Sequence, residues 1–175
     1  MTAGRKANGG AQHWGTPPIY VKAVRKVLGR IDLDPCSNEF SVVDARVEYR
    51  LPEHDGLIES WDYKTIYVNP PYGTDKARGT RIRDWLGRCI DAHRKYKSEV
   101  IALVPVATNT GHWKKSVWGA ARSVAFLYDT RLKFMVDGEP SVRGAPMACA
   151  AVYWGILHAK TFREVFAEHG AVVSV

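Results

Sequence analysis

The stretch Ile66-Tyr67-Val68-Asn69-Pro70-Pro71-Tyr72-Gly73 is the most informative part of this 175-residue chain. Its apolar start predicts a buried strand, and two consecutive prolines predict a turn where that strand stops. A proline fixes its own φ at about −65° and drives the preceding residue toward an extended conformation. Because Asn69 and Pro70 both precede a proline, we expect a stiff turn that holds the Asn69 side chain and the Pro70 carbonyl in fixed directions.

Two fixed acceptors of this kind suit a planar amino group, which offers two N–H donors. The exocyclic nitrogen of a flipped-out adenine is the obvious candidate. In this interpretation the Asn69 carboxamide oxygen and the Pro70 carbonyl each accept one N–H, and Tyr72 stacks on the base. The alternative is a purely structural turn, because a chain leaving a strand often needs proline or glycine.

Strands and helices are expected to alternate on both sides of this turn. Strands are predicted at residues 31–34, 66–68, 100–104, 124–128, 148–156 and 172–173, and helices at 17–28, 82–93, 110–120 and from 161 onward. Thr16 is the expected N-cap of the first helix, whose inner face includes Ile19, and Thr161 and Glu164 form a capping-box pattern at the last. The alternation predicts an α/β fold: a single Rossmann-like domain with a mostly parallel sheet and helices on both faces.

The domain is expected to span residues 13–175, after a disordered segment at 1–12. The net charge of +7 suits a polyanionic partner such as nucleic acid. Three cysteines without pairing or metal-binding spacing predict reduced thiols and no metal. We expect a cytoplasmic protein without a membrane segment, because no apolar run approaches the roughly 18 residues of a spanning helix and no signal peptide is recognisable.

Two turns are expected where ligands bind in open α/β sheets, beyond the carboxyl ends of the strands. One is Asp34-Pro35-Cys36-Ser37 and the other is Asn69 to Tyr72. If their strands are neighbours, the two turns face one crevice, so that Asp34 meets a polar cofactor and Asn69 meets the substrate. The alternative for Asp34 is an ordinary turn aspartate before proline.

Five blocks resemble the phage-type DNA N6-adenine methyltransferases (Dam-like). In order they are Trp14-x-Thr16-Pro17, Leu33-Asp34-Pro35-Cys36-Ser37, Asp55-Gly56-Leu57, Trp61 and Asn69-Pro70-Pro71-Tyr72-Gly73. Later segments are also similar to that family: Leu103-Val104-Pro105 with Thr108 and Trp113, and Arg131-Leu132-Lys133-Phe134. The resemblance covers most of the chain. It implies S-adenosyl-L-methionine as methyl donor, adenine N6 in double-stranded DNA as acceptor, no metal, and a location in the host cytoplasm if the protein is phage-encoded.

The resemblance also implies roles for individual residues. The catalytic motif is Asn69, Pro70, Pro71 and Tyr72, and the cofactor is contacted by Trp14, Thr16, Pro17, Asp34, Pro35, Cys36 and Asp55. Simpler roles stay open: a helix cap for Thr16, a surface turn for Asp55, and core packing for Trp14 and Trp61. Segment 31–37 departs from the glycine-rich turn that many methyltransferases of this fold carry after the first strand, because it contains no glycine.

Basic residues follow the catalytic motif closely. Lys76, Arg78, Arg81, Arg83 and Arg88 are predicted to form a mobile basic loop and helix start that hold DNA phosphates, with Arg131 and Lys133 as a second contact. The alternative is a solvated helix face. Two other functions stay open for the whole chain: methyl transfer to another planar nitrogen (an RNA base or a protein glutamine), and an inactive nucleic-acid-binding module.

Overall fold

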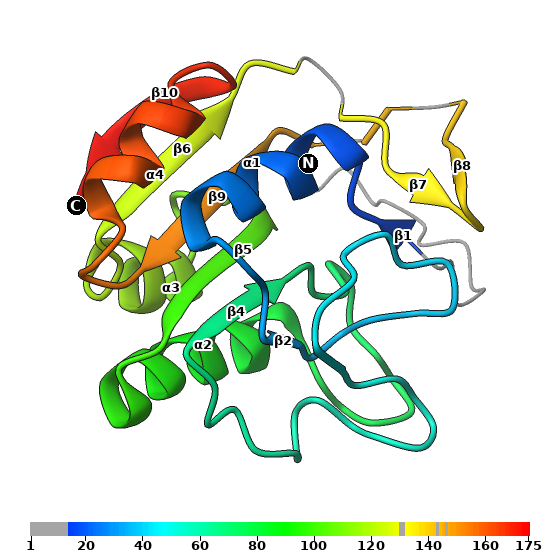
Figure 1. The fold of residues 1–175 in the computed structure, drawn as a ribbon. Coiled ribbons are helices and arrows are strands. Elements are labelled where there is room, and N and C mark those ends of the chain that lie inside the picture. Colours follow the sequence, from blue (N-terminus) through cyan, green and yellow to red (C-terminus); the bar gives the residue numbers. More distant parts are fainter. Residues whose placement is uncertain (1–13, 130–131, 143, 146) are drawn as a thin grey trace.

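The computed structural model describes residues 14–129, 132–142, 144–145 and 147–175, so the disordered segment expected at 1–12 lies outside the described residues. A seven-stranded sheet forms the middle layer (Figure 1). In sheet order its strands are β10 (Gly170–Ser174), β6 (Ser123–Leu127), β9 (Cys149–Trp154), β5 (Glu99–Pro105), β4 (Thr65–Val68), β2 (Leu33–Asp34) and β3 (Val47–Glu48).

This sheet is mixed, whereas the sequence predicted a mostly parallel one. Strands β3, β2, β4 and β5 pair in parallel, but β9 pairs antiparallel with both β5 and β6, and β10 pairs antiparallel with β6. A parallel return needs a long crossover, usually through a helix. The described part of the connection from β6 to β9 contains short strands and no helix. Strand β9 therefore enters the sheet antiparallel, between β5 and β6.

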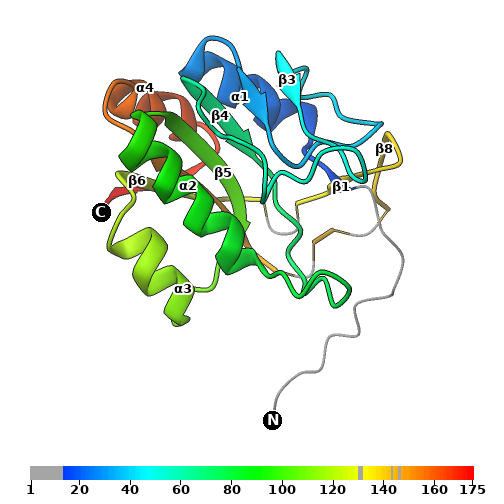
Figure 2. The ribbon, with the colours of Figure 1, turned by 90° about the horizontal axis from the view of Figure 1, so that it is seen from below.

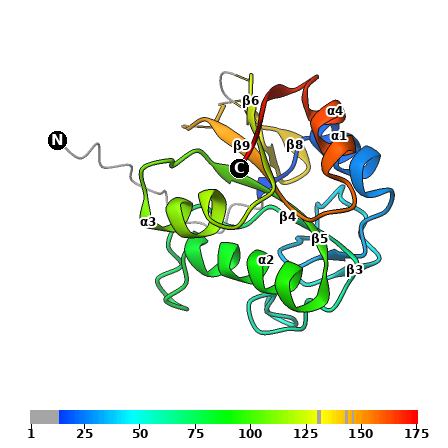
Figure 3. The ribbon, with the colours of Figure 1, turned by 90° about the vertical axis from the view of Figure 1, so that its left-hand side faces the viewer.

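Helices cover both faces of the sheet, as predicted. Helices α1 (Pro18–Leu28) and α4 (Ala159–Phe166) lie on one face. Helix α2 (Ile82–Tyr96) and the short α3 (Gly111–Trp113), which continues into a π-helical turn η1 (Lys114–Trp118), lie on the other. Figure 2 shows the sheet between the two pairs, and Figure 3 shows the same layers from the side.

The central strands β4, β5 and β9 are largely apolar because helices cover both faces of the sheet. Successive side chains of a strand point to opposite faces. Tyr67 and Ile101 therefore belong to the core under α1 and α4, whereas Ile66 and Val100 belong to the core under α2. This burial explains the continuous apolar run in β5, since a strand covered on both sides needs no polar positions.

Two expected helix starts differ from the structure. Helix α1 has Pro17 as its N-cap, and the Thr16 side chain is instead buried, with its hydroxyl 2.6 Å from the Tyr67 hydroxyl. A buried hydroxyl needs a hydrogen-bond partner, and Tyr67 supplies it. The Ile19 side chain, expected on the inner face, is 56% exposed.

The last helix, α4, begins at Ala159, with His158 as N-cap, so Thr161 lies inside the helix and does not cap it. The turn before α4 is held by Glu99 at the start of β5. Its carboxylate accepts hydrogen bonds from the backbone N–H groups of Ile156, Leu157 and His158 at 3.0, 3.2 and 3.3 Å. The chain therefore satisfies these donors from another strand, which local sequence patterns do not reveal.

A second, three-stranded sheet was not predicted. It contains β1 (Trp14–Gly15), β7 (Met135–Val136) and β8 (Glu139–Pro140), with Trp14 opposite Val136 in an antiparallel pair. It lies to one side of the large sheet (Figure 1). Strands of two residues are too short for a visible alternation of polar and apolar residues. This small sheet reaches the Asn69 turn, because Trp14 of β1 accepts a hydrogen bond from the Asn69 side chain.

Candidate functional site

The turns after β2 and β4 lie side by side. Leu33 of β2 is the parallel partner of Ile66 of β4, so both strands end at the same edge of the sheet. Burial and the neighbouring Asp34 carboxylate raise the pKa of the Cys36 thiol well above its usual value. The turns that contain Asp34 and Asn69 follow neighbouring strands, which is the condition that the sequence set for a shared crevice.

The Asn69 side chain is oriented by the small sheet. Its amide nitrogen donates a hydrogen bond to the backbone carbonyl of Trp14 in β1, at 3.1 Å. The carboxamide oxygen accepts no hydrogen bond from any described residue. Because an amide donates only from its nitrogen, the contact with Trp14 engages that end of the carboxamide and leaves its oxygen as an acceptor. Pro70 is buried and Pro71 is exposed.

The Tyr72 ring is held at two points. Its hydroxyl donates a hydrogen bond to the Leu103 carbonyl of β5 at 3.1 Å, and its ring meets Phe134 edge-on with centroids 5.6 Å apart. Phe134 also packs on the Trp14 ring, with centroids 5.3 Å apart. One buried phenylalanine thus contacts Tyr72 and the residue that orients Asn69, so the two side chains are held relative to each other.

A buried carboxylate stands at the end of β2. The Asp34 side chain is 4% exposed, and its Oδ1 accepts a hydrogen bond from the Cys36 backbone N–H at 3.1 Å. Burial raises the pKa of Asp34 to about 7. A cation placed beside this group would favour the charged form and lower that pKa. The buried Asp34 carboxylate therefore fits a positively charged ligand.

Two hydroxyl groups lie near this carboxylate. The buried Thr16 and Tyr67 hydroxyls are 2.6 Å apart. Burial raises the pKa of Tyr67, and the nearby Asp34 acts in the same direction, so the Tyr67 hydroxyl keeps its proton. Pro17, which is half-buried, follows Thr16 at the start of α1 and lines a shallow cavity of about 280 Å³ together with Tyr20 and Lys133.

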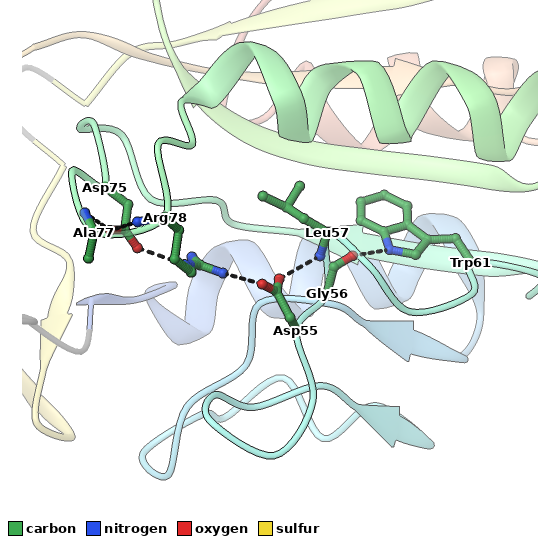
Figure 4. A network of polar contacts seen from close by, with 7 residues as sticks. All are labelled: Asp55, Gly56, Leu57, Trp61, Asp75, Ala77 and Arg78. Atoms are coloured by element: carbon green, nitrogen blue, oxygen red, sulfur yellow. Dashed lines mark hydrogen bonds and ion pairs between the residues drawn. The ribbon is translucent and has the colours of Figure 1, made fainter.

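The Asp55-Gly56-Leu57 turn packs directly on the turn after β2. A Cβ atom on Gly56 would lie 1.8 Å from the Pro35 carbonyl oxygen, so only glycine fits against it. The Asp55 carboxylate accepts from the Leu57 backbone N–H at 2.9 Å, and the Trp61 indole N–H donates to the Gly56 carbonyl at 2.7 Å (Figure 4). The structure thus brings the blocks around Asp34, Asp55 and Asn69 together at one edge of the sheet.

The predicted DNA contacts occupy different surroundings. Lys76, Arg81, Arg83 and Lys133 are exposed. Arg78 instead pairs with two carboxylates, Asp55 and Asp75. The Arg88 guanidinium lies 5.1 Å from the centre of the Trp61 ring and donates to the Glu59 carbonyl. Arg131 lies outside the described residues.

Three residues of the site were missed as such from the sequence: Tyr67, Gly56 as a packing residue, and Phe134 as the ring between Trp14 and Tyr72. Tyr67 reads as one more apolar strand residue, and its contact with Thr16 spans 51 positions. The glycine of Asp55-Gly56-Leu57 was the one available signal, because a glycine often marks a close approach of two backbone segments. The ring of Phe134 carries no local signal of its role.

No three His, Cys, Asp or Glu side chains are grouped to hold a metal ion within the part of the chain that the structure describes. In the same part, no helix is both long and apolar enough to cross a membrane.

The family comparison covers the whole site. The model of the family described as DNA N-6-adenine-methyltransferase (Dam) matches residues 5–166, which is nearly the whole chain. No curated protein and no solved structure gives a significant match. The matched range includes β1, both turns and the basic segment after Tyr72. The chain therefore belongs to the DNA N-6-adenine-methyltransferase (Dam) family, a family of enzymes that methylate adenine in DNA.

Proposed function

We propose that this protein transfers a methyl group from S-adenosyl-L-methionine to N6 of a flipped-out adenine at specific sites in double-stranded DNA. The observation that carries the proposal is the orientation of Asn69. Its amide nitrogen is bonded to the Trp14 carbonyl and its oxygen is left as an acceptor, in a turn that follows the strand next to that of the buried Asp34. The Asn69 oxygen suits the amino group of the acceptor base. The buried Asp34 carboxylate suits a positively charged cofactor such as a sulfonium compound.

On the acceptor side, the residues act by position. The Asn69 oxygen and the Pro70 carbonyl each accept one N6–H, which draws the nitrogen toward tetrahedral geometry and frees its lone pair from the ring. After the methyl group is transferred, one of the two N6 protons is lost to solvent, so the product amine is neutral. The Tyr72 ring, whose hydroxyl is bonded to Leu103, stacks on the base. Unstacking a base from the duplex costs a few kcal/mol, and these contacts offset that cost.

On the donor side, the cofactor is held by the residues around β2 and the start of α1. Asp34 binds the ammonium group of its amino-acid end, and Trp14, Thr16, Pro17, Pro35, Cys36 and Asp55 surround the cofactor. The bound cofactor supplies a methyl group that is already activated by positive sulfur. The protein therefore contributes mainly alignment of donor and acceptor. Asp34, whose own side chain is buried, also stabilises positive charge.

The duplex is held by the exposed basic residues. Lys76, Arg81 and Arg83 follow the catalytic motif, and Lys133 precedes Phe134. Contacts of this kind bind phosphates without reading sequence. Their place next to Asn69 and Phe134 brings the backbone of the target strand to the site. A cytoplasmic protein would meet its DNA without crossing a membrane.

A single transfer assay tests the proposal. The protein is incubated with tritiated S-adenosyl-L-methionine and, separately, with unmethylated duplex DNA, RNA and bulk protein, after which the labelled product is digested and identified. Label in N6-methyladenine from DNA is the expected result, and Asn69→Ala should remove it. Label in RNA or in protein glutamine would show that the substrate is not adenine in DNA. DNA binding without any transfer would make the protein an inactive binding module.

A further inference from the structure

Arg78 lies between two carboxylates that belong to different segments. Its Nη1 is 2.8 Å from Oδ2 of Asp55, and its Nε is 2.7 Å from Oδ2 of Asp75 (Figure 4). The three side chains are 20 to 33% exposed, so the pairs are shielded from solvent over most of their surface. One guanidinium with two acidic partners uses its planar array of donors as a bridge.

Asp75 also organises the loop in which Arg78 itself lies. Its Oδ1 accepts from the backbone N–H groups of Ala77 and Arg78, at 3.0 and 3.2 Å, and its backbone bridges to Thr80. The hydrogen bond from the Arg78 side chain lowers the pKa of Asp75. The Asp75 carboxylate therefore stays charged and keeps its ion pair with Arg78. Residues 73–80, called here the acceptor loop, directly follow Tyr72 in sequence. The contacts of Asp75 with Ala77, Arg78 and Thr80 hold this loop in one conformation.

Asp55 fixes the other end of the bridge. Its turn packs on the Pro35 carbonyl through Gly56 and is held by the Trp61 indole. Through Arg78, the acceptor loop is therefore tied to the turn that follows β2. Nothing else among the described contacts joins the side chains of the acceptor loop to this turn.

The charges around Arg78 disfavour a phosphate. One positive group faces two carboxylates, which leaves a local excess of negative charge. A DNA phosphate approaching Arg78 would meet Asp55 and Asp75 within about one hydrogen-bond length of the same guanidinium, and like charges at that range repel strongly. Lys76, Arg81 and Arg83 lie close by in sequence and are exposed.

We infer that Arg78 is a positioning residue that fastens the acceptor loop to the Asp55 turn, and that it is not a ligand of DNA phosphate. The inference rests on the proposed function, in which Tyr72 serves the substrate side and the Asp55 turn serves the cofactor side. In this arrangement, the ion pair holds the two halves of the site at one spacing. Breaking it lets the acceptor loop drift relative to the cofactor.

The test uses Arg78→Gln, Asp55→Asn and the double variant, with Arg163→Gln on α4 and Asp91→Asn on α2 as matched controls at exposed positions. Hydrogen exchange of peptides covering residues 73–80 is measured first, because it needs no activity. Both single variants should speed hydrogen exchange of the backbone amides at positions 77 and 78 by about tenfold. The two control variants should exchange at these positions as the wild type does.

Kinetics and DNA binding follow on the same proteins. Each single variant should lower kcat/KM for the cofactor by about tenfold, and the double variant should be no worse than the poorer single one. The dependence of DNA affinity on salt should keep its wild-type slope in Arg78→Gln. If Asp55→Asn exchanges like wild type, or if Arg78→Gln lowers that slope by about 1, as expected for a lost phosphate contact, the inference is wrong. If the wild-type protein transfers no methyl group, the proposed function fails, and the exchange data alone decide whether Arg78 fastens the loop.

Discussion

The side chain of Asn69 and the backbone of Trp14, 55 positions apart, are joined by a 3.1 Å hydrogen bond from the Asn69 amide nitrogen to the Trp14 carbonyl. This bond makes a two-residue strand, β1, part of the site. It engages the nitrogen end of the carboxamide and leaves the oxygen as an acceptor, and the Phe134 ring contacts both Trp14 and Tyr72. The geometry of the turn that contains Asn69 therefore depends on a segment that is remote in sequence.

Replacing Asn69 with alanine should abolish methyl transfer while leaving cofactor affinity close to wild type. The substitution removes the acceptor for one N6–H but no group of the Asp34 turn. Loss of one preorganised hydrogen-bonding group at a reacting atom lowers turnover by about 100-fold or more. Turnover is measured with saturating cofactor, and cofactor binding by calorimetry. Turnover within a few-fold of wild type would exclude the role proposed for Asn69.

Replacing Asp34 with asparagine should change how stability depends on pH. The pKa of folded Asp34 is raised to about 7, whereas an aspartate in the unfolded chain titrates near its usual value of about 4. Between these values the folded protein holds a proton that the unfolded chain has lost. The contribution of Asp34 to the free energy of unfolding is therefore complete below about pH 4 and is lost as the pH rises to about 7, by roughly 4 kcal/mol at most.

Denaturant unfolding of wild type and Asp34→Asn at pH 4, 5.5, 7 and 8 checks this prediction. The variant should lose less stability from pH 4 to 7 and should be the more stable protein at pH 8. Its cofactor affinity should fall, because the proposed partner of the cationic group is gone. Parallel curves for the two proteins would show that Asp34 is not the buried titrating group described here.

Replacing Gly56 with alanine should destabilise the protein severely. The added Cβ would lie 1.8 Å from the Pro35 carbonyl oxygen, so the Asp55 turn must move off the turn after β2. Forcing atoms into such a packed contact costs about 2–4 kcal/mol. Gly87 in α2 is the matched control, because a Cβ there meets nothing within 4 Å. Gly87→Ala should raise stability by about 0.5–1 kcal/mol, and urea unfolding distinguishes the two.

Replacing Glu99 with glutamine should loosen the turn before α4. Burial acts to raise the pKa of Glu99, but hydrogen bonds from Ile156, Tyr153, Leu157 and His158 lower it overall. The carboxylate therefore stabilises the fold at neutral pH, and this contribution is lost as the pH falls through its folded pKa. The amide cannot accept all of these donors, so the free energy of unfolding should drop by about 1–3 kcal/mol at pH 7. The gap between the two proteins should narrow on acidification; a constant gap in urea unfolding would contradict the assignment.

Replacing Lys133 with alanine should weaken DNA binding in a salt-dependent way. Lys133 is exposed and directly precedes the buried Phe134. Loss of one phosphate contact reduces the slope of log K against log salt by about 1. Lys160→Ala on α4, where the lysine pairs with Glu164 at 3.8 Å, is the control and should keep the wild-type slope. Equal slopes for wild type and Lys133→Ala would remove Lys133 from the DNA-binding surface.

The sequence by itself determined the main helices and the central strands, and it predicted the chemistry of the Asn69 motif. The apolar spacing from Ile82 to Ile90 predicted α2, and the unbroken apolar run from Val100 to Val104 predicted β5, because periodicity and burial of single elements are written in neighbouring residues. The stiffness of the Asn69 turn also follows from its two prolines alone. The family resemblance was visible in five blocks, and the family comparison confirmed it.

Tertiary structure decided how these pieces meet. It inserted β9 antiparallel between β5 and β6, gave Thr16 to Tyr67 as a partner, and bonded Asn69 to Trp14. It also drew Arg78, a basic residue like its neighbours in sequence, into a bridge between Asp55 and Asp75. Residue type specifies what a side chain can bond to. Which partner it finds depends on segments more than 20 residues away, as between Arg78 and Asp55, and only the packed chain brings those within hydrogen-bonding distance.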